Sequence, residues 1–243
     1  MKEIKLNIDG KEVKAKEGST IVEAAKQAGI RIPTLCYHEN LSSYGACRIC
    51  SVEITGNGKA RVVPACTHHV EEGLTVNTSS ERVLKIRRRL IDLLLTRAPE
   101  AQIVQDLATE YGIKKSTSKE AGTQQKCVSC DLCCLCVRVC DEIVGMKAIG
   151  KPDGEKGSMP FLQNPKACIA CGACAYVCPT GEIQMEDVGD TRIIHRWGRQ
   201  EEYKLKKCSV CGSYFAPEVQ LEYFRKRANL PEDYFDVCPD CRK

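Results

Sequence analysis

The sequence predicts an α+β protein divided into small domains, and three observations support this class. The chain has 243 residues, enough for one large domain or about two to three small ones. Segments in which polar and apolar residues alternate occur beside segments with helical periodicity. Only 5% of the residues are aromatic, whereas 18 are cysteine, so we expect small cores that are supplemented by bound metal.

The composition excludes several classes of protein. Apolar residues make up 43% and charged residues 28% of the chain, which is typical of folded rather than disordered proteins. The longest run of Leu, Ile and Val, Leu93 to Leu95, is far shorter than the ~20 residues of a membrane span, and the N-terminus does not resemble an export signal. A formal charge of +4 is mild. We therefore expect a cytoplasmic protein with no membrane span and no nucleic-acid partner.

The cysteines form three groups. Without an export signal, and with Cys-x-x-Cys pairs throughout, they are expected to bind metal rather than to form disulfides. Two thiolates in such a pair point at one ion or cluster. The first group is Cys36, Cys47, Cys50 and Cys66; the second is Cys127, Cys130, Cys133, Cys134, Cys136, Cys140, Cys168, Cys171, Cys174 and Cys178; the third is Cys208, Cys211, Cys238 and Cys241.

Residues 1–78 are predicted to form a small mixed sheet with one helix, in a β-grasp arrangement. Asp9-Gly10 and Gly56-Asn57-Gly58 are hairpin turn signals between alternating segments. A short helix is expected to follow Thr20, because Thr20 and Glu23 can form a capping box. The expected strands are Glu3 to Asp9, Lys11 to Lys16, Ser51 to Thr55, Arg61 to Ala65 and Leu74 to Thr78.

Residues 79–126 are predicted to be a helical linker. An apolar stripe predicts a helix over residues 80–96, and a second short helix is expected from Ile103 to Tyr111, before a polar segment. The first helix also carries four basic residues. They are interpreted as a solvated face, with a docking face for an acidic partner as the alternative. These residues are Lys85, Arg87, Arg88 and Arg89.

Two further domains are expected, over residues 127–190 and 191–243. Repeated glycine and proline predict that the segment from Gly150 to Pro165 is a loop or hairpin connector. In the last domain a helix is expected over residues 217–230, since Pro217 suits the first turn and Pro231 ends it.

The first cysteine group can hold a [2Fe–2S] cluster. Cys36-x10-Cys47-x2-Cys50-x15-Cys66 offers two thiolates to each of two irons, and the small residues Gly45 and Ala46 allow a loop to wrap around the cluster. A zinc site is the alternative, which the predicted fold disfavours. His38, His68 and His69 are interpreted as surface histidines rather than ligands.

The second group contains two copies of the bacterial ferredoxin run, C-x2-C-x2-C-x3-C. In two-cluster ferredoxins the fourth cysteine of each run binds the other cluster. The first [4Fe–4S] cluster is therefore assigned to Cys130, Cys133, Cys136 and Cys178. The second is assigned to Cys168, Cys171, Cys174 and Cys140. Cys127 and Cys134 are left out as ligands, because a frame that begins at Cys127 requires a fourth cysteine at position 137, where Val137 stands.

The third group resembles a zinc ribbon. Cys208-x2-Cys211 and Cys238-x2-Cys241 are two Cys-x-x-Cys pairs separated by a helix, and four thiolates can bind one zinc ion. A third [4Fe–4S] cluster is the alternative. The role expected for this four-cysteine tail is structural, or as a docking platform.

The cysteine motifs resemble those of a family. IPTLCYHENLSSYGACRICSVEI is similar to the N-terminal [2Fe–2S] domain of the largest peripheral-arm subunit of complex I, to the small diaphorase subunit of NAD-linked hydrogenases, and to bifurcating iron-only hydrogenases. CVRVC and ACIACGACAYVCPTGEI are similar to the same family's ferredoxin module. The family usually has a further cluster bound by one His and three Cys. No Cys or His occurs from residue 70 to residue 126, so that cluster is expected to be absent.

The resemblance implies an iron–sulfur electron-transfer subunit that is not itself catalytic. The implied partners are a flavoprotein that binds NAD(P)(H), a small [2Fe–2S] subunit, and a catalytic subunit (hydrogenase, formate or aldehyde oxidoreductase) or ferredoxin. A soluble electron-bifurcating complex is the expected setting. Two alternatives stay open. One is the iron–sulfur subunit of a succinate dehydrogenase or fumarate reductase, although its first spacing is shorter; the other is a redox-sensing or zinc-ribbon adaptor.

Overall fold

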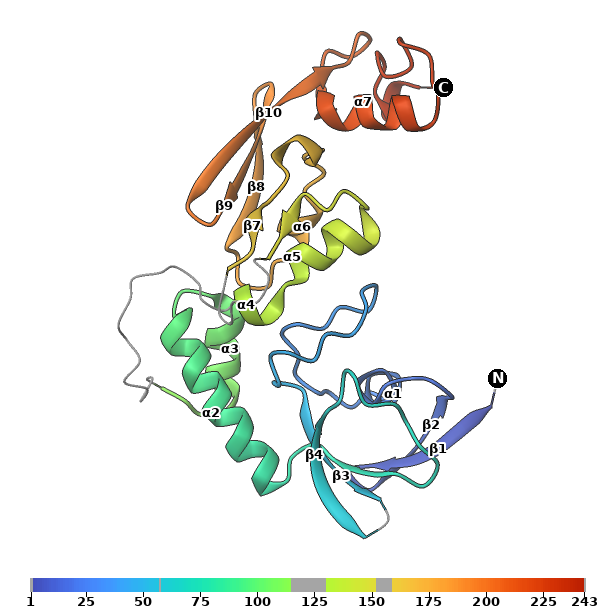
Figure 1. Cartoon of the computed structure of the whole chain (residues 1–243), viewed down its shortest axis with the longest axis vertical. Helices are drawn as coiled ribbons and strands as arrows, with labels where there is room; N and C mark the ends of the chain where they lie inside the picture. The colour runs from blue at the N-terminus through green and yellow to red at the C-terminus, as the bar shows by residue number, and fades with distance from the viewer. Residues whose placement is uncertain (1, 57, 115–129, 152–158, 243) are drawn as a thin grey trace. The chain divides into compact units, whose positions relative to one another are not determined.

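The computed structural model describes residues 2–56, 58–114, 130–151 and 159–242. The chain divides into two compact units, Met1–Cys134 and Leu135–Lys243. The predicted polar segment over residues 115–126, the extra cysteine Cys127 and residues 152–158 of the expected connector lie outside the described residues. Figure 1 shows the elements of both units along the chain.

The first unit contains a five-stranded mixed sheet of strand order β2-β1-β5-β3-β4. The two predicted hairpins pair antiparallel, β1 with β2 and β3 with β4. β5 pairs parallel with β1 and antiparallel with β3, and thereby joins the two hairpins into one sheet. The predicted strands are confirmed to within about one or two residues. Their bounds are β1 Glu3–Ile8, β2 Lys11–Lys16, β3 Ser51–Gly56, β4 Lys59–Pro64 and β5 Thr75–Asn77.

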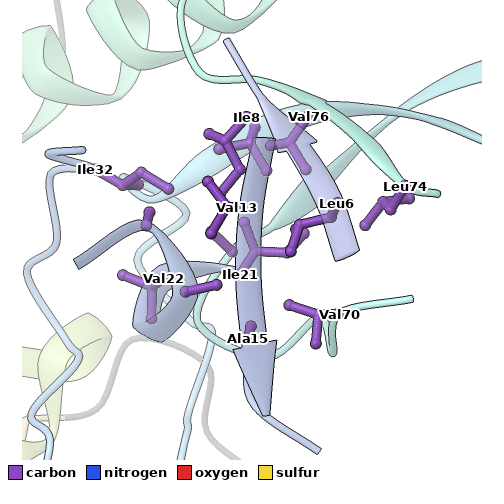
Figure 2. Close-up of a cluster of buried hydrophobic side chains, with 14 of the residues drawn as sticks. Leu6, Ile8, Val13, Ala15, Ile21, Val22, Ile32, Val70, Leu74 and Val76 are labelled. Carbon is purple, nitrogen blue, oxygen red and sulfur yellow. The ribbon is translucent and has the colours of Figure 1, made fainter. Parts of the chain in front are cut away.

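A single short helix, α1 (Ile21–Gln27), covers the core of this sheet. The predicted capping box is confirmed: the Thr20 hydroxyl accepts from the Glu23 backbone, and the Glu23 carboxylate accepts from the Thr20 backbone N–H. Figure 2 shows Ile21 and Val22 of the helix among the inward side chains of β1 and β2. Burial of these aliphatic side chains stabilises the fold, at about 25 cal/mol for each Å² removed from water.

Two helices follow the sheet, α2 (Glu81–Arg97) and α3 (Gln102–Glu110). Lys85, Arg88 and Arg89 of α2 are exposed, as predicted for a solvated face. Arg87 is different. Its side chain is buried with 3% exposure and binds backbone carbonyls of the first unit, so its placement on the solvated face is wrong.

The second unit begins with short helical segments and continues as a meander. Residues 149–150 and 161–162 pair as a hairpin, which confirms the expected connector. The following four-stranded sheet has the order β11-β10-β9-β8 and is antiparallel throughout. The β8–β9 hairpin crosses residue 190, so the domain boundary predicted there falls inside a hairpin. The elements are α5 Leu135–Arg138, η1 Val139–Ile143, β6 Ile149–Gly150, β7 Phe161–Leu162, η2 Pro165–Ala167, α6 Ala173–Tyr176, β8 Ile183–Val188, β9 Thr191–Arg196, β10 Arg199–Lys207, β11 Tyr214–Pro217, α7 Glu218–Arg227 and η3 Pro239–Cys241.

The helix expected over residues 217–230 is confirmed as α7, although it ends earlier. Pro217 stands at its N-cap, and the helix ends at Arg227, three residues before the predicted end. Asn229 adopts a left-handed conformation with φ of 50°, which stops the helix before Pro231. Among the residues that the structure describes, none of the helices combines the length and hydrophobicity needed to cross a lipid bilayer.

Candidate cluster and metal sites

The first cysteine group gathers beside the five-stranded sheet. Cys36 lies in the loop that follows α1, Cys47 and Cys50 lie in the loop that leads into β3, and Cys66 follows β4. All four side chains are buried, with exposures of 3% or less. The backbone N–H of Ala65 donates to the Cys50 carbonyl (3.2 Å), which continues the β3–β4 pairing toward the cysteines.

The sulfurs of this group approach one another in two pairs. Hydrogen bonds with Cys36 and burial raise the pKa of Cys47, and hydrogen bonds with Cys66 and burial raise the pKa of Cys50. Within the described part of the chain, these sulfurs do not form a group of three or more around one point. Two separate pairs are the arrangement that two irons require, whereas one zinc ion requires four converging sulfurs.

The loop around Cys47 has the backbone conformation of a cluster-binding loop. Gly45 and Arg48 both have positive φ, 68° and 60°, a conformation in which successive backbone N–H groups can face an anion. A Cβ atom at Gly45 would lie 2.9 Å from Cγ2 of Thr67, so this position also needs the small residue that the sequence analysis singled out.

Arg87 holds the backbone on both sides of Cys50. Its Nε donates to the Ile49 carbonyl (3.0 Å) and its Nη2 to the Ser51 carbonyl (2.6 Å). Its Nη1 donates to the hydroxyl of Tyr111 (2.8 Å). The helical region therefore places a buried positive charge beside the [2Fe–2S] loop. Sequence analysis missed this role, because an arginine within a basic run carries no pattern that marks it as buried.

The three histidines differ in burial. His69 is exposed and its Nδ1 lies 2.9 Å from the Gly18 carbonyl, and Nδ1 of His38 accepts from the Asn40 backbone (3.2 Å). The side chain of His68 is only 20% exposed, so its prediction as a surface residue is wrong. Burial lowers the pKa of His68, and the nearby Arg61 lowers it further.

The second unit contains a cavity lined by four cysteines. Its empty space is about 340 Å³, part of it open to solvent. Cys140 comes from the first ferredoxin run, whereas Cys168, Cys171 and Cys174 come from the second. The structure thus brings together the four residues that were assigned to the second [4Fe–4S] cluster. Burial raises the pKa of Cys174 to about 11, which is the cost of a thiolate that no metal stabilises.

The loop that lines this cavity is conformationally special. Ala170 has a φ of 53° and Gly172 a φ of 77°. A Cβ atom at Gly172 would lie 2.4 Å from Sδ of Met185 on β8, so the backbone approaches the sheet too closely for any other residue. The backbone N–H of Ala148 donates to Sγ of Cys140 (3.3 Å). The cavity, the small loop residues and the N–H···S contact fit a buried cluster.

Two polar side chains from the sheet contact Cys168. Arg196 of β9 is 1% exposed and its Nη2 lies 3.4 Å from Sγ of Cys168. Burial lowers the pKa of Arg196, but the nearby Cys174 and Cys168 thiols raise it more, so the side chain stays charged. Burial and a hydrogen bond with Cys168 raise the pKa of Tyr203 on β10. Neither residue was identified from the sequence, since they lie outside the cysteine motifs.

The ligands assigned to the first [4Fe–4S] cluster come from both units. Cys130 and Cys133 lie on α4 (Cys130–Cys133) of the first unit, and Cys136 and Cys178 belong to the second. This ligand set stays a prediction. Cys134, which was left out as a ligand, is buried; its Sγ lies 3.5 Å from the Cys130 carbonyl and 3.8 Å from the Tyr44 hydroxyl.

The third cysteine group converges on one point. The sulfurs of Cys208, Cys211, Cys238 and Cys241 all lie within 4.8 Å of one another, and those of Cys211 and Cys238 are 3.8 Å apart. A tetrahedral ion with metal–sulfur bonds of about 2.3 Å places neighbouring sulfurs about 3.8 Å apart. Backbone N–H groups of Cys211 and Cys238 stabilise the thiolate and lower the pKa of Cys208 to about 6. This site can bind a metal at neutral pH.

Comparison with known protein families agrees with the two types of site. Residues 1–81 match the family described as a 2Fe-2S iron-sulfur cluster binding domain, and residues 162–181 match a 4Fe-4S binding domain. The chain is therefore an iron–sulfur protein with both classes of cluster domain. It is related to iron–sulfur subunits of NADH-quinone oxidoreductases and of NAD-linked hydrogenases, as the resemblance implied.

Three relatives illustrate this relationship. The alpha subunit of NADPH-Fe(3+) oxidoreductase from Geobacter sulfurreducens is 34% identical over 202 residues, covering 74% of this chain and 24% of that protein. The NADP-reducing hydrogenase subunit HndD from Solidesulfovibrio fructosivorans is 33% identical over 218 residues, covering 75% and 36%. A chain of the NAD+-reducing [NiFe]-hydrogenase structure aligns with a TM-score of 0.58 and 25% identity, covering 73% of this chain and 79% of that one. The chain thus spans about a quarter to a third of these two curated relatives.

Proposed function

We propose that this chain relays single electrons through one [2Fe–2S] and two [4Fe–4S] clusters and performs no bond-making itself. The observation that carries the proposal is the cavity in which Cys140 joins Cys168, Cys171 and Cys174. A cysteine of the first run beside three of the second is the ligand exchange that defines a two-cluster ferredoxin. Bound there, a cluster supplies a one-electron redox centre, and the protein holds and tunes it.

The [2Fe–2S] centre is proposed for Cys36, Cys47, Cys50 and Cys66, in a β-grasp domain over residues 1–78. The sheet order, with β5 inserted parallel to β1 between two hairpins and α1 against one face, supports the β-grasp assignment. The two sulfur pairs support two irons. We assign the other [4Fe–4S] cluster to Cys130, Cys133, Cys136 and Cys178.

The proposed partners follow from the relatives. Their printed names refer to NADPH, NADH and NADP, so a flavoprotein that binds NAD(P)(H), with a small [2Fe–2S] subunit, is the proposed exchange partner on one side. Ferredoxin or a catalytic subunit such as a hydrogenase is proposed on the other. The further proposal of a bifurcating complex rests on the short chain and the absent His/Cys3 motif, by analogy.

We propose that the four-cysteine tail binds one zinc ion in a zinc-ribbon-like domain. Its four sulfurs are close enough for a single tetrahedral ion, whereas an Fe4S4 cube would have to separate them further. The ion would close the chain around α7 by joining Cys208 and Cys211 to Cys238 and Cys241. Since this arrangement closes the fold without redox chemistry, its role is structural.

Anaerobic purification of the full chain followed by metal analysis tests the assignment. We expect roughly ten irons and one zinc per chain, and electron paramagnetic resonance of the reduced protein should show several separately reducible clusters. Cys66→Ser should remove about two irons, whereas Cys134→Ala, which also changes a buried cysteine, should remove none. Roughly fourteen irons without zinc would convert the tail into a third four-iron site. A colourless protein, or one with cystine bridges, would contradict the relay.

A further inference from the structure

Arg196 is a buried cation in the wall of the four-cysteine cavity. It lines the cavity together with Cys140, Cys168, Cys171 and Cys174, and its side chain is 1% exposed. One of its terminal nitrogens, Nη2, already lies 3.4 Å from Sγ of Cys168. Arginine is almost never fully buried unless its charge and its N–H groups are satisfied, so this position requires an explanation.

The remaining N–H groups of Arg196 have no acceptor among the described residues. Nε and Nη1 are both buried without a hydrogen bond. Glu201 is the nearest acid, with Oε2 3.4 Å from Nη1, but it does not form a hydrogen bond with it. Buried donors are nearly always paired in native proteins, so two orphan donors on one guanidinium at a cavity wall indicate an acceptor that occupies the cavity.

We propose that Arg196 donates N–H···S hydrogen bonds to the [4Fe–4S] cluster held by Cys140, Cys168, Cys171 and Cys174, and thereby makes it the more easily reduced of the two four-iron clusters. Reduction adds one negative charge to a cluster. A fixed positive charge and hydrogen bonds to its sulfurs favour that reduced form, so they raise the reduction potential. Arg196 is thus a tuning residue rather than a ligand.

This inference rests on the proposed relay and adds a direction to it. Within the part of the chain that the structure describes, no second arginine is given as lining this cavity. Electrons that reach the two-cluster module would therefore collect on the cluster beside Arg196, and a partner that takes electrons from this module would take them from that cluster. The other four-iron cluster would be the intermediate step.

The test is a redox titration of the full chain, monitored by electron paramagnetic resonance, for wild type, Arg196→Met and Arg199→Met. Arg199 is the cross-strand neighbour of Arg196 and is exposed, so its replacement removes the same charge without touching the cavity. In Arg196→Met we expect one four-iron signal to titrate at a lower potential. The ratio of reduced to oxidised cluster should fall about tenfold at a given potential, or about 59 mV for a one-electron couple. Arg199→Met should leave both signals in place.

Arg196→Lys protects the test against loss of the cluster. Lysine keeps the positive charge but lacks the planar fork of donors, so we expect a smaller downward shift at full iron content. An unchanged titration in iron-replete Arg196→Met or Arg196→Lys overturns the inference, as does an equal shift of both four-iron signals or an equal shift in Arg199→Met. If the wild type itself contains no reducible four-iron clusters, the proposed relay fails instead.

Discussion

The hydroxyl of Tyr111 lies 2.8 Å from Nη1 of Arg87, so the end of α3 holds the guanidinium that binds the carbonyls on both sides of Cys50. In the family that the chain resembles, this helical region contributes to a further cluster. Here the same region carries a buried cation that orders the [2Fe–2S] loop. The helices of the linker are therefore expected to matter for the first cluster even though they provide no ligand to it.

Replacing Arg87 by methionine should destabilise the first unit and its cluster. Two buried carbonyls would lose their donor, at a cost of about 2–4 kcal/mol of unfolding free energy. Tyr111→Phe removes only one hydrogen bond and should cost about 1 kcal/mol. Chemical denaturation and the rate of iron release under chelator measure both effects. Arg88→Met, on the exposed face of the same helix, is the control; equal effects of Arg87→Met and Arg88→Met would contradict the assigned role.

Gly45→Ala should weaken the [2Fe–2S] loop for two reasons. A side chain at a φ of 68° costs about 1–2 kcal/mol, and the added Cβ would press on Thr67. Gly73 is a matched control, because its φ is 73° and a Cβ there meets no atom within 4 Å. We expect iron retention to fall more in Gly45→Ala than in Gly73→Ala, and Thr67→Ser to recover part of the difference. Equal retention in the two alanine variants would show that the contact is unimportant.

Cys134→Ala should leave the iron content unchanged and lower the unfolding free energy by about 1 kcal/mol. The residue is buried and its thiol lies against the Cys130 carbonyl, so its loss removes packing and a weak hydrogen bond rather than a ligand. Cys127→Ala should also retain the iron. Metal analysis beside denaturation separates the two effects. A loss of about four irons from either variant would show that the ligand frame begins elsewhere.

Asp187 gives the second unit a measurable pH dependence. Nε and Nη2 of Arg192 donate to its carboxylate at 2.7 and 2.8 Å and lower the pKa of Asp187. Its stabilising effect is therefore present above the pKa of the unfolded chain, about 3.9, and is lost as the pH falls through the lower folded value. The carboxylate is 42% exposed, so Asp187→Asn should cost only about 0.5 kcal/mol at pH 7.

Parallel denaturation of wild type and Asp187→Asn at pH 7, 4 and 3 checks this sign. The difference in unfolding free energy should shrink as the pH falls. Glu186→Gln removes a carboxylate from the same strand that lacks the two-bond contact with an arginine, and should show little effect. A difference that grows in acid would contradict the assignment.

Sequence patterns predicted the first unit more completely than the second. Alternation, the two glycine-containing turns and the capping box at Thr20 located the strands and α1, because each signal is local. Strands β8 to β10 were not predicted: β8 buries only Ile183, so it shows no apolar alternation. The cysteine runs identified three sites by spacing alone. The residues that surround the sulfurs, such as Arg87 and Arg196, come from distant segments, and only the tertiary fold shows their contacts.

Strand β11 carries a further consequence for the four-cysteine tail. It pairs with the last residues of β10, and the register runs from Leu205 opposite Pro217 to Lys207 opposite Tyr214. A chain shortened before Cys208 would lose not only its metal ligands but also this cover, and would leave a row of backbone N–H and C=O groups open to other chains. The metal-binding tail is in this sense a guard against aggregation.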